Sequence, residues 1–160
     1  MRSQFDGRQS LWGMAVHEEL QPRELSTSDS LRLLSGIRFG RVVFSRYALP
    51  TIRPVNHVVD GGMIVIHANP GTTLSADRQV VAYEADTIDQ ATQYGWCVIV
   101  TGTAEEVTDS GDLARYRRLL PTTLPGPRHR IVRIRPDFVT GVEYVPAALL
   151  PEDARPTEDR

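Results

Sequence analysis

The feature that most constrains the fold is a succession of short runs rich in valine and isoleucine, separated by turn-forming residues. The sequence predicts strands at residues 41–45, 51–59, 63–68, 80–85, 96–107, 131–134 and 139–144. Asp60-Gly61-Gly62, between the second and third runs, is typical of a tight hairpin turn. Because helices do not alternate regularly with these strands, a doubly wound parallel sheet is excluded. We therefore predict a small antiparallel β-barrel, which hides the edges of such apolar strands.

Two short helices and two polar tails complete the expected organisation. Ser26 and its polar neighbours offer N-cap oxygens to a helical stripe of leucines that Gly36 ends, and Asp109 caps a second helix over residues 113–120. Pro54 predicts an edge or a bulge within its strand, and Gly102 predicts a bend or a bulge. We expect one domain over residues 26–146, an N-terminal tail over 1–25 and a polar C-terminal tail over 147–160.

Composition excludes several classes of function. All 18 basic residues are arginine, so neither a lysine Schiff base nor a P-loop lysine is available. The net charge is −2 and no long basic run occurs, so we expect neither a nucleic-acid partner nor a membrane partner. The single cysteine, Cys97, excludes an internal disulfide and a cysteine-rich zinc site, and it favours a cytoplasmic location. The longest apolar runs, such as residues 96–100, are too short to span a bilayer.

The order of several motifs resembles the pyridoxamine 5′-phosphate oxidase-like FMN-binding split-barrel family. The resemblance covers residues 31–144 and depends on Gly40-Arg41-Val42-Val43, Arg53-Pro54-Val55-Asn56, His67-Ala68-Asn69-Pro70-Gly71-Thr72 and Gly95-Trp96. It implies a mainly β fold, a six-stranded antiparallel split barrel with two short helices. It also implies a homodimer with FMN in clefts between the two subunits.

The resemblance also implies which residues bind FMN. The segment Pro54-Val55-Asn56 would line the flavin ring, and the turn from His67 to Thr73 would hold the phosphate. Such a turn can direct backbone N–H groups and two hydroxyls at an anion, and Asn56 carries both donors and acceptors. No metal site is expected, and no catalytic residue is assigned. The implied cofactor-binding residues are Arg53, Pro54, Val55, Asn56, His67, Ala68, Thr72, Thr73 and Trp96.

Two positions depart from the family pattern. Relatives usually carry a lysine where this chain has Thr73, and often an arginine where it has His67. A charge-assisted contact contributes about 1.5–3 kcal/mol, so the loss of one lowers affinity about 10- to 100-fold. Arg53, Arg46 and Arg78 are the candidates to replace the missing charge.

Several site residues keep a second interpretation. Asn56 and His57 are adjacent on a strand and point to opposite faces, and the resemblance favours Asn56 as the residue in the cleft. Arg53 also fits a solvent-facing edge charge, and His67 also fits a strand end satisfied by the backbone. Trp96 fits a core or interface aromatic better than a flavin contact.

Three functions follow from the resemblance. The first is an FMN-dependent oxidoreductase that acts on an unidentified small-molecule substrate, in which the flavin supplies the redox chemistry. The second is a deazaflavin-dependent reductase, whose cofactor has a longer acidic tail that suits arginines. The third is a non-enzymatic flavin-binding or ligand-sensing dimer. Oxidation of pyridoxamine phosphate itself is disfavoured, because the chain ends soon after the last predicted strand.

Overall fold

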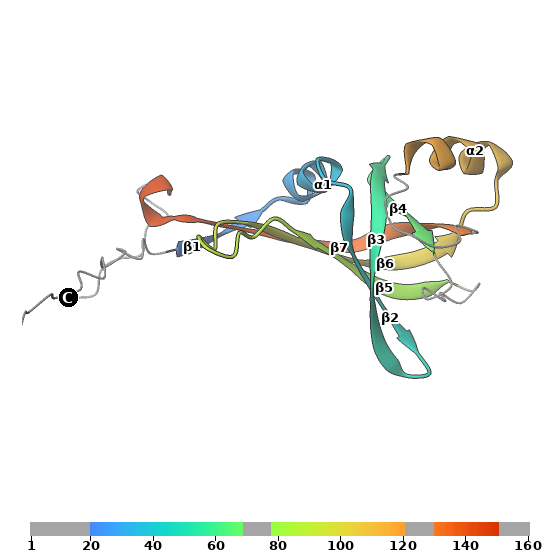
Figure 1. Ribbon diagram of the computed structural model, residues 1–160, viewed down its shortest axis with the longest axis horizontal. Helices are drawn as coiled ribbons and strands as arrows, with labels where there is room; N and C mark the ends of the chain where they lie inside the picture. Colours follow the sequence, from blue (N-terminus) through green and yellow to red (C-terminus); the bar gives the residue numbers. More distant parts are fainter. Residues whose placement is uncertain (1–19, 69–77, 121–129, 151–160) are drawn as a thin grey trace, which may run out of the picture.

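Seven strands and two α-helices make up the described part of the chain. The computed structural model describes residues 20–68, 78–120 and 130–150 (Figure 1). Its elements, in chain order, are β1 (Leu20–Leu25), α1 (Thr27–Ser35), β2 (Phe39–Arg46), β3 (Leu49–Asp60), β4 (Met63–Ala68), β5 (Gln79–Asp86), β6 (Gly95–Glu106), α2 (Ser110–Leu119), β7 (Arg130–Pro146) and the 3₁₀ turn η1 (Ala147–Leu149). None of the helices within these three ranges is long and apolar enough to cross a membrane.

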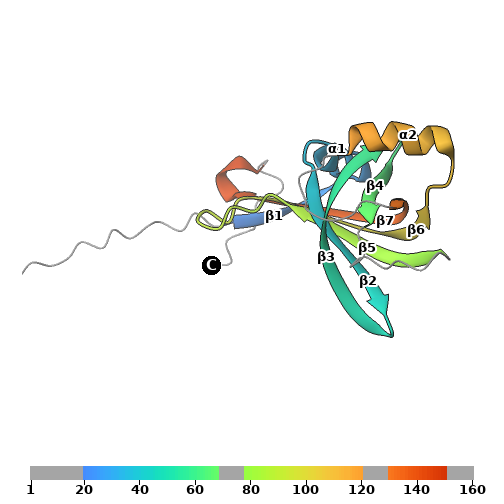
Figure 2. The same ribbon diagram turned by 45° about the vertical axis from the view of Figure 1, so that its right-hand side comes forward.

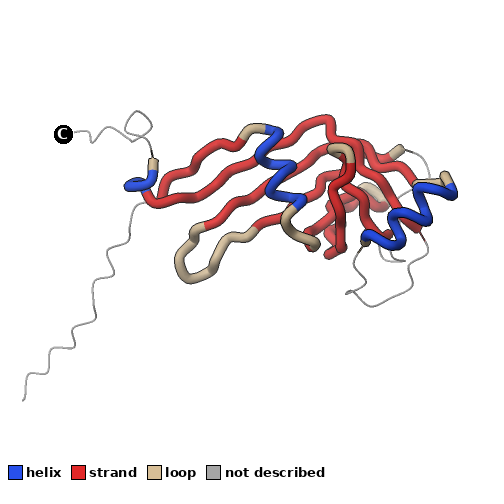
Figure 3. Tube along the Cα trace, turned by 90° about the horizontal axis from the view of Figure 1, so that it is seen from above, coloured by secondary structure: helices blue, strands red, loops and turns tan. Residues whose placement is uncertain are grey.

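The strands form a closed antiparallel ring. The sheet order is β1-β7-β4-β3-β2-β5-β6, and β6 pairs with β7 to close six of the strands. Strand β7 pairs with β6 on one side, and on its other side first with β4 and then with β1. Strands β4 and β1 pair with different parts of β7, and the gap between them splits the barrel wall. Figure 3 shows the long β1–β7–β6 ribbon that extends beyond the barrel. The predicted split barrel is confirmed.

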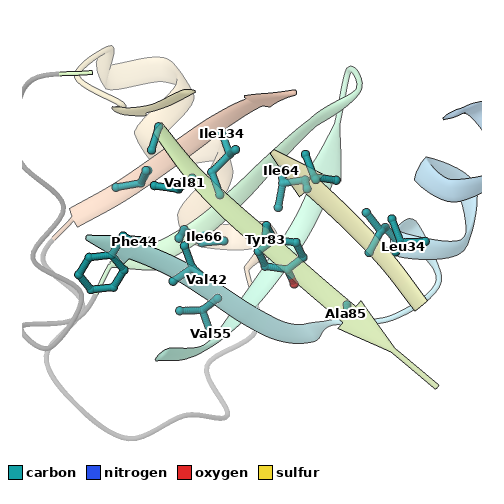
Figure 4. Close-up of a cluster of buried hydrophobic side chains, with 14 of the residues drawn as sticks. Leu34, Val42, Phe44, Val55, Ile64, Ile66, Val81, Tyr83, Ala85 and Ile134 are labelled. Atoms are coloured by element: carbon teal, nitrogen blue, oxygen red, sulfur yellow. The ribbon is translucent and has the colours of Figure 1, made fainter. Parts of the chain in front are cut away.

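Alternate residues of each strand fill the barrel with apolar side chains. On β6, Val98 and Val100 are fully buried, and on β4, Ile64 and Ile66 are fully buried. Figure 4 shows these isoleucines beside Tyr83 of β5, with Leu34 of α1 at one end of the cluster. Burial of one such side chain stabilises the fold by about 1.5–3 kcal/mol. Because successive side chains of a strand point to opposite faces, the alternation of apolar residues specifies which face of each strand turns inward.

Helix α2 covers a second, smaller apolar cluster on the outside of the barrel. Val58, Val65 and Ile131 point outward from three neighbouring strands and pack against Tyr116 of α2. The Tyr116 hydroxyl donates to the Asp60 carboxylate at 2.8 Å, and Arg115 pairs with the same carboxylate. These hydrogen bonds lower the pKa of Asp60. Asp60 therefore joins the β3–β4 hairpin to α2.

Removal of one hydroxyl tests this connection. We expect Tyr116→Phe to lower the free energy of unfolding by about 1–2 kcal/mol, because a hydrogen bond to a carboxylate is lost while the ring stays packed. Urea unfolding measures the change. Arg118→Ala, an exposed position on the same helix, is the control and is expected to change stability by less than about 0.5 kcal/mol. Equal effects of the two substitutions would contradict the assignment.

Local signals in the sequence predicted most elements correctly. Gly61 and Gly62 form the hairpin turn with φ values of 56° and 79°, and Ser26 and Asp109 are the helix N-caps. Among the described strands, β3 pairs only with β2 at Pro54, since its pairing with β4 begins at His57. The predicted edge position of Pro54 is therefore confirmed.

Three predictions about where elements begin and end differ from the structure. Residues 131–134 and 139–144 belong to one strand, β7, because a register shift opposite Gly102 accommodates the extra residue Asp137. A Cβ on Gly102 would lie 2.1 Å from the Arg135 carbonyl oxygen, so this close approach needs glycine. The expected N-terminal tail, residues 1–25, contains β1, whose polar residues pair with β7. The expected C-terminal tail, 147–160, begins with the turn η1.

Candidate functional site

The residues predicted to line the cofactor divide between the two faces of β3. Val55 pairs with Gly40 and is buried inside the barrel, and the next inward residue, His57, is buried as well. Pro54 and Asn56 alternate with them and therefore belong to the outer face, the side of the sheet that points away from the barrel interior. Val55 thus contributes to the core, whereas on the outer face Pro54 is exposed and Asn56 is largely buried.

His67 of β4 lies on the same outer face as Asn56. The β3–β4 ladder ends at the pair His57–Ile66, so Asn56 and His67 are the next residues on the two strands, and alternation places both side chains on the outer face. Phe39 of β2 is the partner of Asn56 on its other side and is 44 % exposed. The outer face therefore brings together Phe39, Pro54, Asn56 and His67 from three neighbouring strands, a group that we call the outer-face site.

The other predicted cofactor residues occupy different positions. Arg53 is exposed, and its guanidinium donates to the Ile52 carbonyl at 2.9 Å. Ala68 and Trp96 are buried in the main core, so Trp96 is the core aromatic that the sequence favoured, and its contact with a cofactor stays a prediction. Thr72 and Thr73 lie outside the described residues. Arg78, the first described residue after them, is exposed.

The amide of Asn56 has a fixed orientation. Its Nδ2 donates to the Arg38 carbonyl at 3.1 Å, and the backbone N–H of His57 donates to the same oxygen at 3.0 Å. Asn56 is only 6 % exposed. The amide is therefore preorganised in one orientation, which favours directional hydrogen bonding over a flexible contact.

A buried hydrogen-bonded pair lies directly beneath the outer-face site. The Tyr83 hydroxyl is 2.6 Å from His57 Nδ1, and His57 Nε2 is 2.9 Å from the Leu34 carbonyl oxygen. A carbonyl only accepts, so Nε2 carries the proton and Nδ1 accepts from the tyrosine. Both side chains are completely buried. Their rings pack edge to face, with the ring centres 5.1 Å apart. This pair connects α1, β3 and β5.

Burial makes the fold sensitive to protonation of His57. Desolvation lowers the pKa of His57 in the folded state below its ordinary value, so below a pH of about 6.5 the unfolded chain binds the proton more readily. The contribution of His57 to stability is complete above this pH and decreases as the pH falls below it. We expect the free energy of unfolding to fall by about 1 kcal/mol between pH 7 and pH 5.5.

Urea unfolding at the two pH values measures this difference. His57→Gln removes the titrating group, so the variant is expected to lose the fall although its stability at pH 7 is lower. The same fall in both proteins would assign the effect to other groups.

A charged cluster adjoins the site, and sequence reasoning missed it. Arg41 of β2 pairs with Glu84 at 3.0 Å and Asp86 at 3.1 Å, and Cys97 Sγ lies 3.8 Å from Glu84. Desolvation, followed by the two carboxylates, raises the pKa of Cys97 to about 11, so the thiol is protonated near neutral pH and is a poor nucleophile. The alternation of side chains along β2, β5 and β6 places all four residues on the outer face. They become neighbours only through the register between these strands, which the sequence does not specify.

The donor set of the outer-face site fits the edge of a flavin ring. A flavin edge presents both donors and acceptors, and an asparagine amide and an imidazole match both kinds of group. Pro54 has no N–H to leave unsatisfied, and with Phe39 it offers an apolar surface to an aromatic ring. The residue types of the outer-face site are therefore compatible with the edge and face of a planar heteroaromatic ligand.

Comparison with known proteins gives the family. The model of the family described as pyridoxamine 5′-phosphate oxidase matches residues 26–143. The chain belongs to this family. The uncharacterised protein Rv0080 of Mycobacterium tuberculosis is 43 % identical over 129 residues, which is 76 % of this chain and 85 % of that protein.

Two solved structures are also similar to this chain. A candidate pyridoxamine 5′-phosphate oxidase from Corynebacterium glutamicum is 32 % identical, with a TM-score of 0.65, and the match covers 77 % of this chain and 93 % of that one. An FAD-binding protein from Mycobacterium smegmatis is 33 % identical, with a TM-score of 0.61, and the match covers 76 % and 98 % of the two chains. The family resemblance stated from the sequence is confirmed.

Proposed function

We propose that the protein is a flavin-binding oxidoreductase whose outer-face site holds the flavin ring. The observation that carries the proposal is that Pro54 and Asn56 of β3 share the outer face with His67 of β4, just beyond the end of the β3–β4 ladder. Family membership and the FAD-binding relative from M. smegmatis support it. FMN, predicted from the sequence, and FAD share the ring that the site would hold.

The residues of the chain would bind and orient the cofactor. When bound, a flavin accepts a hydride from a reduced donor and returns it to a substrate. The Asn56 amide and the His67 imidazole would orient the ring edge by hydrogen bonds, while Pro54 and Phe39 would exclude water from the ring face. The substrate is a small molecule that the residues of this chain do not identify.

We also propose that the protein works as a homodimer. Phe138 and Ile99 are exposed apolar residues on the outer face of the sheet, at 73 % and 42 %, and monomers seldom leave large apolar areas in contact with water. Light scattering measures the mass at micromolar concentration. A dimer is expected, and a monomer would contradict this part of the proposal.

Titration with flavins tests the function. FMN and FAD are added separately to the purified protein, and quenching of flavin fluorescence is followed. We expect either FMN or FAD to bind, with one flavin molecule per subunit. If neither binds up to about 100 μM, which corresponds to a binding free energy weaker than about −5.5 kcal/mol, the proposal fails. Binding of a deazaflavin alone would favour the deazaflavin-dependent reductase.

The phosphate turn supplies a second prediction. Thr73→Lys restores the charge that relatives carry, so we expect FMN to bind about 5- to 30-fold more tightly, with a larger gain at low salt. Arg78→Ala tests whether Arg78 already supplies the charge, in which case this substitution weakens binding and Thr73→Lys adds little. If neither substitution changes the affinity, the turn does not hold the phosphate.

A further inference from the structure

The outer halves of β2 and β3 form an arm, residues 43–54, that projects from the barrel (Figure 2). Strands β2 and β3 pair without interruption up to Arg46 and Leu49, so the arm is a regular two-stranded ribbon. The pairing of β2 with β5 ends at Val43. Beyond this residue, the described backbone pairs of the arm join its own two strands. Residues 45–54 of the arm are exposed or half-buried, whereas Phe44 at its base is buried in the main core, and the Gln79 side chain donates to the Ser45 carbonyl at 2.8 Å.

The arm exposes apolar side chains and holds a strained turn. Tyr47 is 87 % exposed, Leu49 68 % and Ile52 56 %. The turn residues Tyr47 and Ala48 have φ values of 52° and 61°, a left-handed conformation that usually requires glycine or asparagine. The Arg46 guanidinium lies 5.4 Å from the centre of the Tyr47 ring and restricts it. Strain and exposed apolar groups at one tip point to a binding role.

A groove of about 390 Å³ lies on the outer face of the ribbon β1–β7–β6, at the other end of the same sheet. The side chains that point outward at the groove belong to alternate residues of the three strands. Most of them are apolar or aromatic, so the groove is suited to apolar side chains. They are Glu24, Cys97, Ile99, Thr140, Val142 and Tyr144.

The arm and the groove have opposite charges. The arm carries Arg46 and Arg53 and no acidic residue, a net charge of +2. The groove has Glu24 in its wall, and Glu84 and Asp86 lie beside Cys97 with Arg41 between them. Three carboxylates and one arginine give this region a net charge of −2. Apolar surface and charge are thus complementary between two separate parts of one chain.

The arm cannot reach the groove of its own chain. Cys97 of β6 and Asn56 of β3 are separated across the sheet by β5 and β2. Three strand spacings place them about 14 Å apart. Leu49 lies a further seven residues along β3, about 23 Å. The groove that an arm can enter therefore belongs to another molecule.

We propose that the arm of one copy lies in the groove of a second copy, and that the second copy places its arm in the groove of the first. A two-fold axis relates the two contacts, so each surface is used once and the assembly closes as a dimer. The inference rests on the proposed homodimer and specifies which surfaces form it. It does not depend on the flavin.

The single native cysteine allows a direct test, because Cys97 lines the groove. In Leu49→Cys, a mild oxidant at pH 9 is expected to join the arm of one copy to Cys97 of the other, giving a covalent dimer on a non-reducing gel. Peptide mapping identifies the linked cysteines. A disulfide requires Cα atoms within about 7 Å, so a link between residues 49 and 97 can only be intermolecular.

Matched variants control for random collision. Leu119→Cys introduces a thiol at a half-exposed position of α2, and we expect at least tenfold less covalent dimer from it. Leu49→Cys combined with Cys97→Ser is expected to lose the link. Ile52→Cys repeats the test at a second position of the arm.

The outcomes separate this inference from the other proposals. A dimer by light scattering that gives no 49–97 link, and no 52–97 link, overturns the arm-in-groove contact and leaves the dimer in place. A monomer overturns both. Flavin titration of the same samples is independent, so a monomer that binds flavin would contradict the dimer and the arm contact but support the cofactor.

Discussion

Gly40→Ala is expected to lower the free energy of unfolding by about 3 kcal/mol, the upper range for overpacking of a core. A Cβ at position 40 would lie 2.1 Å from the Tyr83 hydroxyl oxygen and 2.6 Å from the Glu84 carbonyl oxygen. The tyrosine cannot move aside easily, because its hydroxyl is hydrogen-bonded to His57 inside the barrel. The carbonyl belongs to the backbone of β5, which pairs with β6. Relief of the contact therefore requires the sheet itself to shift.

Urea unfolding of Gly40→Ala and Gly111→Ala gives the comparison. Gly111 lies in the first turn of α2 and is exposed, and its added Cβ would meet only the Asp109 side chain, at 3.2 Å. Alanine favours a helix over glycine by about 1 kcal/mol, so this control is expected to be neutral or slightly stabilising. A similar stability for both variants would contradict the close packing of β2 on Tyr83.

Asn56→Leu is expected to weaken flavin binding about 10-fold, which corresponds to about 1.4 kcal/mol. The substitution keeps the size of the side chain but removes the donor and the acceptor that we assign to the ring edge. It also removes the hydrogen bond to the Arg38 carbonyl, so some loss of stability accompanies it. Fluorescence quenching during flavin titration measures the affinity.

Tyr116→Phe is the matched control for this effect. It removes one hydrogen bond on the α2 side of the barrel, through Asp60, and it is expected to leave flavin affinity unchanged despite its cost in stability. If both variants bind flavin as tightly as the parent protein, Asn56 does not contact the cofactor. If both weaken binding equally, affinity follows stability and the assignment of Asn56 is again contradicted.

Sequence patterns predicted the elements that short-range signals specify. The Gly61-Gly62 turn and the cap at Ser26 depend on neighbours within a few residues, and both were predicted correctly. β1 was missed because its exposed polar residues, such as Arg23 and Glu24, hide the pattern of a strand that has one partner. β7 was divided because Pro136 is typical of a turn, whereas Pro136 is paired with Gly102 and the strand continues through the bulge at Asp137.

The site was harder to predict, because it depends on contacts between distant strands. Alternation along one strand separated Asn56 from His57, but the burial of His57 depends on Tyr83, 26 residues away. In the same way, the cluster of Arg41 with Glu84 and Asp86 forms only when β2 and β5 pair. The family resemblance supplied the likeness to a flavin site, and the register supplied the face on which His67 joins Asn56.

Hydrogen–deuterium exchange with and without saturating flavin tests whether the outer-face site holds the flavin ring. Residues 49–56 of β3 have one neighbouring strand among the described elements, so this stretch is expected to exchange more readily in the free protein than strands that are paired on both sides. We predict that bound flavin slows exchange in the peptides that contain residues 54–57 and 67–68 and leaves α2 unchanged. Protection confined to other parts of the barrel, with none in these two segments, would contradict the account.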